Sequence, residues 1–281
     1  MFPVFFVSWE TAFSMTQKPP RQGNRSRVHS DRKRRTSQME HTWILAGAVL
    51  AAVLACGWLW RTRRKREFRR SQYRAETGKR LKRVESDKGT EGEYLTSLAL
   101  EKRVRGNRRF VFNAYLPCRS GGSTETDIVM IHEKGIFVIE NKNYYGTVKG
   151  RADREYWDHY LPGKHHTFYN PIYQNKGHVR HLKRLLEEHG WRLPIVSVVV
   201  FNDRLERLRV RKKGTDAIVC KSRRAAGKIN RRLWRMERVL DDGELEAVYD
   251  FLKGQTKPFW WVRHGQKRRA QKAAGHRLRE R

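Results

Sequence analysis

The chain has 281 residues, and its 62 lysine and arginine residues against 29 aspartate and glutamate residues give a formal net charge of +33. This charge predicts attraction to polyanions, of which nucleic acid and anionic lipid are the two obvious classes. The cysteines Cys56, Cys118 and Cys220 are scattered, which excludes a disulfide framework and a CxxC zinc module. Basic runs at residues 61–83 and 257–281 carry much of the charge, so solvated basic tails are the alternative interpretation.

The N-terminal part is predicted to contain one membrane-spanning helix. Residues 1–42 have little periodicity and are expected to be mostly disordered. Residues 43–60, WILAGAVLAAVLACGWLW, have no charged side chain, and tryptophans stand at both ends. A helix of this length spans ~27 Å, close to the ~30 Å hydrocarbon core of a bilayer. A buried soluble helix or a cleaved signal peptide fits this segment less well, because it lacks a polar face and a basic run follows it directly.

A basic juxtamembrane linker is predicted over residues 61–86. It begins with RTRRKREFRR, whereas MEHT lies immediately before the apolar segment. Since lysine and arginine are in excess on the cytoplasmic side of membrane helices, we predict a single-pass membrane protein whose C-terminal domain is cytoplasmic. Arginines between residues 32 and 35 reduce this contrast, and a chain that started at Met39 would show it more clearly. We therefore expect Met39 to be the physiological start and residues 1–38 to be absent from the native chain.

A globular domain is predicted over residues 87–256, before a basic tail at 257–281. The pattern indicates a helix at 89–104, strands at 109–117, 127–131 and 136–142, a strand pair around 146–157, a helix at 174–188, a buried strand at 194–201, a strand at 216–220 and a helix at 243–252. This order is αβββ followed by αβ. It predicts an α/β fold in which helices flank a mixed central sheet.

The segment DIVMIHEKGIFVIENKN, residues 127–143, is predicted to be a hairpin that ends in charged side chains. A turn centred on Glu133 and Lys134 pairs Ile131 with Ile136 and brings Asp127 opposite Glu140. Carboxylates facing each other across two strands repel unless a cation lies beside them. Lys142, two residues beyond Glu140, is expected on the same face of the strand.

Such an arrangement suits metal-dependent hydrolysis of a phosphodiester. Mg²⁺ prefers oxygen ligands and takes one or two protein carboxylates, which Asp127 and Glu140 would supply together with the carbonyl of Asn141. A bound Mg²⁺ or Mn²⁺ activates water, and Lys142 would orient that water or stabilise developing negative charge. The alternative is that the acids are ordinary strand-end residues and Lys142 forms a salt bridge with them.

Several motifs together resemble the nuclease-related domain (NERD) family of the PD-(D/E)xK nuclease-like superfamily. They are GTEGE at 89–93, the acid at the strand start, GIFVIENKNYYG at 135–146 and NPIYQN at 170–175. The resemblance implies a restriction-endonuclease-like αβββαβ core, with Asp127 and Glu140 as metal ligands and Lys142 as the catalytic lysine. It also implies that Glu93 is a third carboxylate of the metal site and that Gln174 is a polar residue near it.

Two functions from different classes are open at this point. The first is a membrane-anchored, Mg²⁺- or Mn²⁺-dependent nuclease acting on DNA or RNA, held to lipid by residues 43–60. The second is a noncatalytic module with the nuclease fold that binds nucleic acid or anionic lipid.

The histidines are interpreted as surface residues. His159, His165 and His166 are placed in a polar loop, and His178 is placed on a basic helix face.

Overall fold

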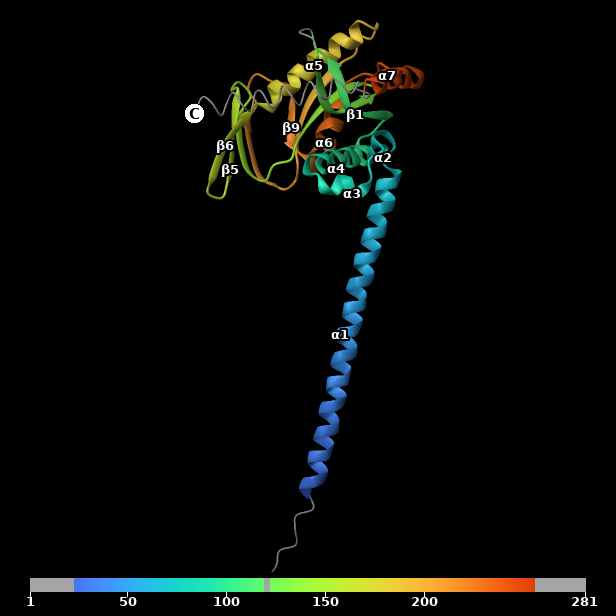
Figure 1. Cartoon of the computed structure of the whole chain (residues 1–281), viewed down its shortest axis with the longest axis vertical. Helices are drawn as coiled ribbons and strands as arrows, with labels where there is room; N and C mark the ends of the chain where they lie inside the picture. The colour runs from blue at the N-terminus through green and yellow to red at the C-terminus, as the bar shows by residue number, and fades with distance from the viewer. Residues whose placement is uncertain (1–22, 119–121, 256–281) are drawn as a thin grey trace, which may run out of the picture. The chain divides into compact units, whose positions relative to one another are not determined.

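The computed structural model describes residues 23–118 and 122–255 (Figure 1), and side chains from residue 43 onward. Residues 1–22 and the predicted tail at 257–281 lie outside the described residues. The chain divides into two compact units, Met1–Arg63 and Arg64–Arg281.

Helix α1 (Gly23–Arg70) contains the predicted apolar segment but begins well before it. Residues 23–42, expected to be disordered, are therefore helical, because extending a formed helix costs little once the apolar segment has nucleated it. Residues Trp43–Arg70 are long and apolar enough to cross a membrane. The large apolar side chains between Trp43 and Trp60 are exposed, because no described part of the chain covers them.

The core of the second unit is a mixed five-stranded sheet in the order β1-β2-β3-β7-β9. Its strands are β1 (Arg108–Pro117), β2 (Ser123–His132), β3 (Gly135–Lys142), β7 (Ile195–Phe201) and β9 (Ile218–Lys221). Strands β1, β2 and β3 are antiparallel neighbours, whereas β3, β7 and β9 run parallel. The predicted mixed central sheet is confirmed.

Helices cover both faces of this sheet (Figure 1). One apolar cluster joins the sheet to α4 (Lys88–Arg103) and α6 (Ser222–Leu233), with contributions from the short helices α2 (Gln72–Thr77) and α3 (Leu81–Ser86). A second cluster joins the opposite face to α5 (Pro171–Glu187) and α7 (Asp242–Gly254). Three strands of another sheet lie between β3 and α5 in the chain; apart from these, the order α4-β1-β2-β3-α5-β7 is the predicted αβββαβ order of a mixed α/β fold.

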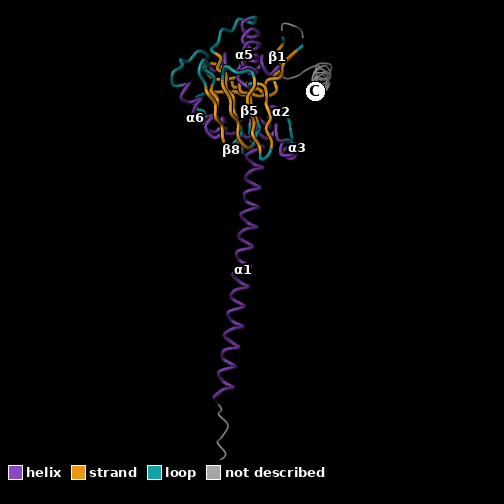
Figure 2. Tube along the Cα trace, turned by 90° about the vertical axis from the view of Figure 1, so that its left-hand side faces the viewer, coloured by secondary structure: helices purple, strands orange, loops and turns teal. Residues whose placement is uncertain are grey.

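A second sheet, β6-β5-β4-β8, packs beside the first and is visible in Figure 2. Its strands are β4 (Gly146–Arg151), β5 (Tyr156–Leu161), β6 (Lys164–Tyr169) and β8 (Leu205–Arg211), and only the first two were predicted. The interpretation of His159, His165 and His166 as loop residues is wrong, because all three lie on β5 and β6. His159 is also buried, and its Nε2 lies 2.7 Å from the carbonyl oxygen of Tyr145.

Candidate active site

The hairpin β2–β3 has the predicted register up to the point where the charged residues begin. Ile131 pairs with Ile136, and the paired ladder ends at Ile128 and Ile139. Asp127, the next residue, is not a ladder partner of Glu140. Its Oδ2 instead accepts a hydrogen bond of 2.8 Å from the backbone N–H of Asn141.

An irregularity in β1 accompanies this change. Asn113 has a positive φ of 53°, an uncommon conformation for a residue other than glycine. The β1–β2 ladder pairs Phe112 with Ile128 and Ala114 with Thr126, leaving Asn113 and Asp127 as the unpaired position between them. Asp127 therefore lies where the sheet is locally distorted, and its carboxylate takes the place of a backbone acceptor for β3.

Glu140 and Lys142 lie on the α5 face of β3 and contact each other. Glu140 is 2 % exposed, and its Oε1 is 2.8 Å from Nζ of Lys142. The same ammonium donates a 2.9 Å hydrogen bond to Oε1 of Gln174, in the first turn of α5. The structure thus brings Glu140, Lys142 and Gln174 together.

His178 belongs to this cluster, and its interpretation as part of a basic helix face is wrong. It is 4 % exposed, and its Nε2 is 3.3 Å from Oε2 of Glu140. Both atoms are buried, and among the described residues neither has a hydrogen-bond partner of good geometry. The sequence signal was present, because His178 follows Gln174 by one helical turn and precedes the core residue Leu182 by another.

Glu93 approaches from α4. Its Oε2 accepts a 3.3 Å hydrogen bond from the hydroxyl of Tyr73. Burial, partly offset by Lys79 and by the Tyr73 hydroxyl, raises the pKa of Glu93 to about 7. Its charge adds to the raised pKa of Asp127, but among the described residues Glu93, Asp127 and Glu140 do not form a group of three acids close enough to hold a metal.

The two strand carboxylates have opposite pKa shifts. Burial and the neighbouring charge of Glu140 raise the pKa of Asp127 well above its usual range, although the Asn141 N–H opposes this. Burial also acts to raise the pKa of Glu140, but His178 and Lys142 outweigh it and hold this pKa below its usual value. Glu140 is therefore the ionised member of the pair, and Asp127 retains a proton to higher pH.

The motif NPIYQN at 170–175 fixes α5 against the site. Asn170 caps the helix by accepting a 2.9 Å hydrogen bond from the N–H of Ile172, and Pro171 occupies the first turn. The side-chain amide of Asn175 donates to the carbonyls of Val138 and Val198 at 2.9 and 3.1 Å. These bonds tie the helix to β3 and β7 and set the position from which Gln174 reaches Lys142.

Gly92, in the GTEGE motif, allows α4 to approach the end of β3. A Cβ atom added to Gly92 would lie 2.6 Å from Nδ2 of Asn141. Asn141 is held there because its Oδ1 accepts a 2.9 Å hydrogen bond from the hydroxyl of Thr96. The glycine is therefore required by close helix–strand packing beside the residue whose N–H binds Asp127.

Gly92→Ala is expected to destabilise the protein by about 1–3 kcal/mol, because the methyl group displaces Asn141. Urea unfolding measures this effect. Gly177→Ala is the matched control, since nothing lies within 4 Å of a Cβ at that helical position, and the exchange should stabilise the helix by up to about 1 kcal/mol. Equal stability of wild type and Gly92→Ala would contradict the packing argument.

A divalent cation is compatible with the donor atoms of this site. Within residues 23–118 and 122–255, no group of three or more His, Cys, Asp or Glu side chains is gathered closely enough to hold a metal. Mg²⁺, however, needs only one or two protein carboxylates. Asp127 and Glu140 offer hard oxygen ligands, and the buried Oε2 of Glu140 has no hydrogen-bond partner among the described residues. The residues fit Mg²⁺ or Mn²⁺.

The structure places Asp127, Glu140 and Lys142 close to the point where the β2–β3 ladder ends. Residues 88–202 match the family model of the nuclease-related domain. An uncharacterized protein of Bacillus anthracis is 31% identical over 134 residues, which cover 47% of this chain and 62% of that protein. No solved structure gives a significant match. Over residues 88–202 the chain is thus similar to the nuclease-related domain (NERD) family.

Proposed function

We propose that this protein is a membrane-anchored, divalent-metal-dependent nuclease. The observation that carries the proposal is the contact chain Glu140–Lys142–Gln174, which lies beside Asp127 at the distorted end of the β2–β3 hairpin. The match of residues 88–202 to a nuclease-related domain supports the same class of reaction.

Each residue of the site has a distinct role in this proposal. Asp127 and Glu140, with the carbonyl of Asn141, would hold Mg²⁺ or Mn²⁺, and Glu93 would complete the acidic side of the site. When bound, the ion supplies an activated water and offsets charge on the phosphate oxygens.

Lys142 stabilises the negative charge that develops on the phosphate. Its pKa is raised, because the attraction of Glu140 outweighs the effect of burial, so the ammonium stays charged at neutral pH. Gln174 orients Lys142 by accepting its 2.9 Å hydrogen bond.

The outer face of α5 supports nucleic acid as the partner. A shallow groove along this helix is lined by tyrosines and cations, among them Tyr169, Tyr173, Lys176, Arg180 and Lys183. Cations bind phosphates, and tyrosine rings stack on bases without regard to sequence, so this surface suits single-stranded DNA or RNA. One of its residues, Tyr173, directly precedes Gln174 in the chain.

The membrane anchor is supported by residues Trp43–Arg70, whose apolar segment is exposed within the chain and carries tryptophans near both ends. The basic residues after it favour a cytoplasmic location for the C-terminal domain. Resistance of the protein to alkaline extraction tests the anchor. Protection of the domain from protease added outside intact cells tests the orientation.

The nuclease proposal is tested with the full chain in nonionic detergent and labelled DNA and RNA. Cleavage is expected with Mg²⁺ or Mn²⁺ and is expected to stop in Asp127→Asn and in Glu140→Gln, because each loses an anionic ligand. Glu125→Gln, which changes an exposed carboxylate on β2, is the matched control and should retain activity. Cleavage that persists unchanged in both site variants would contradict the proposal.

The alternative is a noncatalytic module that binds nucleic acid or anionic lipid with the same fold. The basic groove along α5 is the observation that favours it. Salt-sensitive binding of an oligonucleotide, without cleavage under any divalent ion, would identify this alternative.

A further inference from the structure

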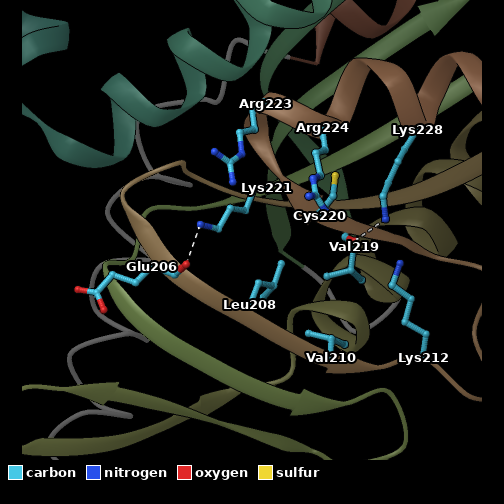
Figure 3. A pocket seen from close by; sticks show the side chains of 10 residues that line it. All are labelled: Glu206, Leu208, Val210, Lys212, Val219, Cys220, Lys221, Arg223, Arg224 and Lys228. Atoms are coloured by element: carbon cyan, nitrogen blue, oxygen red, sulfur yellow. Dashed lines mark hydrogen bonds between the residues drawn. The ribbon is translucent and has the colours of Figure 1, made fainter.

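A second polar cavity lies away from Asp127, Glu140 and Lys142, where the edge strands of the two sheets meet. It has a volume of about 330 Å³ and is lined by residues of β8, β9 and α6 and of the segment that joins the two strands (Figure 3). This volume falls within the range of ligand sites, roughly 300–1,000 Å³. We call it the basic pocket, because its charged lining residues are Lys212, Lys221, Arg223, Arg224, Lys228 and a single acid, Glu206.

The acidic groups near the basic pocket leave it with an excess of positive charge. Figure 3 shows the carboxylate of Glu206 directed away from the other side chains. Asp203 accepts hydrogen bonds from the backbone N–H of Arg223 at 3.1 and 3.2 Å and is 4.0 Å from its guanidinium. Burial raises the pKa of the Cys220 thiol to about 11, so it is uncharged at neutral pH.

Two lysines of the basic pocket lie close enough to repel each other. Lys212 and Lys228 point toward one another in Figure 3, and Nζ of Lys228 donates a 3.4 Å hydrogen bond to the carbonyl of Val219. Burial and then the charge of Lys228 lower the pKa of Lys212. Two half-buried ammonium groups that face each other are stabilised by an anion between them, which a merely solvated basic surface does not need.

Lys221 adds a third cation from the end of β9. Its Nζ donates to the carbonyls of Leu205 and Glu206 on β8, the latter at 3.0 Å, and so it bridges the two sheets. None of the ten described lining residues is aromatic. The lining therefore suits a phosphate group and offers no ring on which a base could stack.

We propose that the basic pocket is a phosphate-binding site, separate from the candidate active site, that takes a phosphate group of a polyanionic ligand. Its place in the sheet favours a nucleic-acid strand as the source of that phosphate. Lys142 on β3 pairs with Phe201 on β7, and Phe201 pairs with Lys221 on β9. The two sites therefore lie at the same end of these parallel strands. Strands two places apart are separated by roughly 10 Å, a distance that one nucleic-acid strand easily spans.

Binding to full-length protein in nonionic detergent with EDTA tests this site, because no metal-dependent cleavage then takes place. The probes are inorganic phosphate and a labelled single-stranded DNA 12-mer. Lys212→Gln/Lys228→Gln is expected to weaken binding at least about tenfold and to reduce the salt dependence by roughly two phosphate contacts. Lys213→Gln/Arg231→Gln removes the same charge from exposed positions and should change affinity little.

The two probes distinguish the source of the phosphate. Binding of inorganic phosphate that is lost in the pocket variant supports a site for free phosphate. Binding of the 12-mer alone, lost in the same variant, supports a site for backbone phosphates. Equal weakening in the pocket and control variants, or no binding of either probe to wild type, would overturn the proposal.

The Tm of the Lys212→Gln/Lys228→Gln variant, measured by thermal unfolding, shows whether this pocket variant is folded. Removing the repulsion between Lys212 and Lys228 should leave the Tm unchanged or raise it. At equal ionic strength, phosphate in place of chloride is expected to raise the Tm of wild type and of the control variant by more than that of the pocket variant, in which only the general stabilising effect of phosphate on folded proteins is left. A phosphate-induced rise of equal size in all three proteins would count against the site.

Discussion

Lys142→Met is expected to lower the cleavage rate by roughly 100-fold to 1,000-fold, the usual effect of removing one group that stabilises transition-state charge. The substitution removes an ammonium that contacts Glu140 at 2.8 Å and Gln174 at 2.9 Å. Single-turnover cleavage of a labelled oligonucleotide at saturating enzyme measures the effect on the chemical step.

Lys164→Met is the matched control, because Lys164 is an exposed lysine on β6. It should cleave at the wild-type rate. Gln174→Leu tests the positioning role and is expected to have a smaller effect than Lys142→Met, since the ammonium keeps its contact with Glu140. Full activity of Lys142→Met would show that the lysine does not take part in the reaction.

Glu93→Gln is expected to stabilise the metal-free protein at pH 8 by up to about 3 kcal/mol and to have little effect near pH 4. Glu93 has its pKa raised from 4.5 to about 7 in the folded state, so the folded protein binds more protons than the unfolded chain between these values. The contribution of Glu93 to the free energy of unfolding therefore falls as the pH rises from 4.5 to about 7. The expected stabilisation follows from the rise of about 2.5 in the pKa of Glu93, because each pKa unit corresponds to about 1.4 kcal/mol.

Urea unfolding in EDTA at pH 4 and pH 8 measures this difference. Glu237→Gln removes an exposed carboxylate that is not among the groups raising the pKa of Glu93, and it serves as the control at both pH values. A Glu93→Gln stabilisation of the same size at pH 4 and pH 8 would mean that side-chain packing, rather than charge burial, causes it.

The parts of the fold that could be predicted have strong local signals. The β2–β3 hairpin has two continuous apolar runs, residues 128–131 and 136–139, on either side of a turn that ends in Gly135, which has a positive φ of 132°. Its register was therefore correct up to Ile128 and Ile139. The motif at 170–175 likewise marked the start of α5 by an Asn–Pro cap, although the helix begins at Pro171 rather than at Gln174.

Other elements were missed because their burial depends on distant parts of the chain. Strand β6 is almost entirely exposed, so it has no apolar alternation from which to recognise it. Helix α6 is strongly basic, and its buried stripe consists of Ala225, Ile229 and Leu233 at one-turn spacing among arginines and lysines. Its signal was present but was obscured by charge.

The candidate site was predictable in its residues but not in its detailed geometry. The motifs named Asp127, Glu140 and Lys142, and two-residue alternation placed Glu140 and Lys142 on one face. Alternation could not reveal that Asn113 distorts the sheet and that Asp127 binds the Asn141 N–H, because both depend on backbone conformation. The buried contact of His178 with Glu140 likewise depends on how α5 docks on β3.

Calorimetric titration of the full-length protein with Mn²⁺ tests most directly whether Asp127 and Glu140 form one metal site. Wild type and Glu125→Gln are expected to bind one ion, with affinity that rises with pH as Asp127 loses its proton. Asp127→Asn/Glu140→Gln is expected to lose this binding while keeping its fold. Mn²⁺ binding of wild-type affinity in the double variant would contradict the assignment of these two carboxylates as metal ligands.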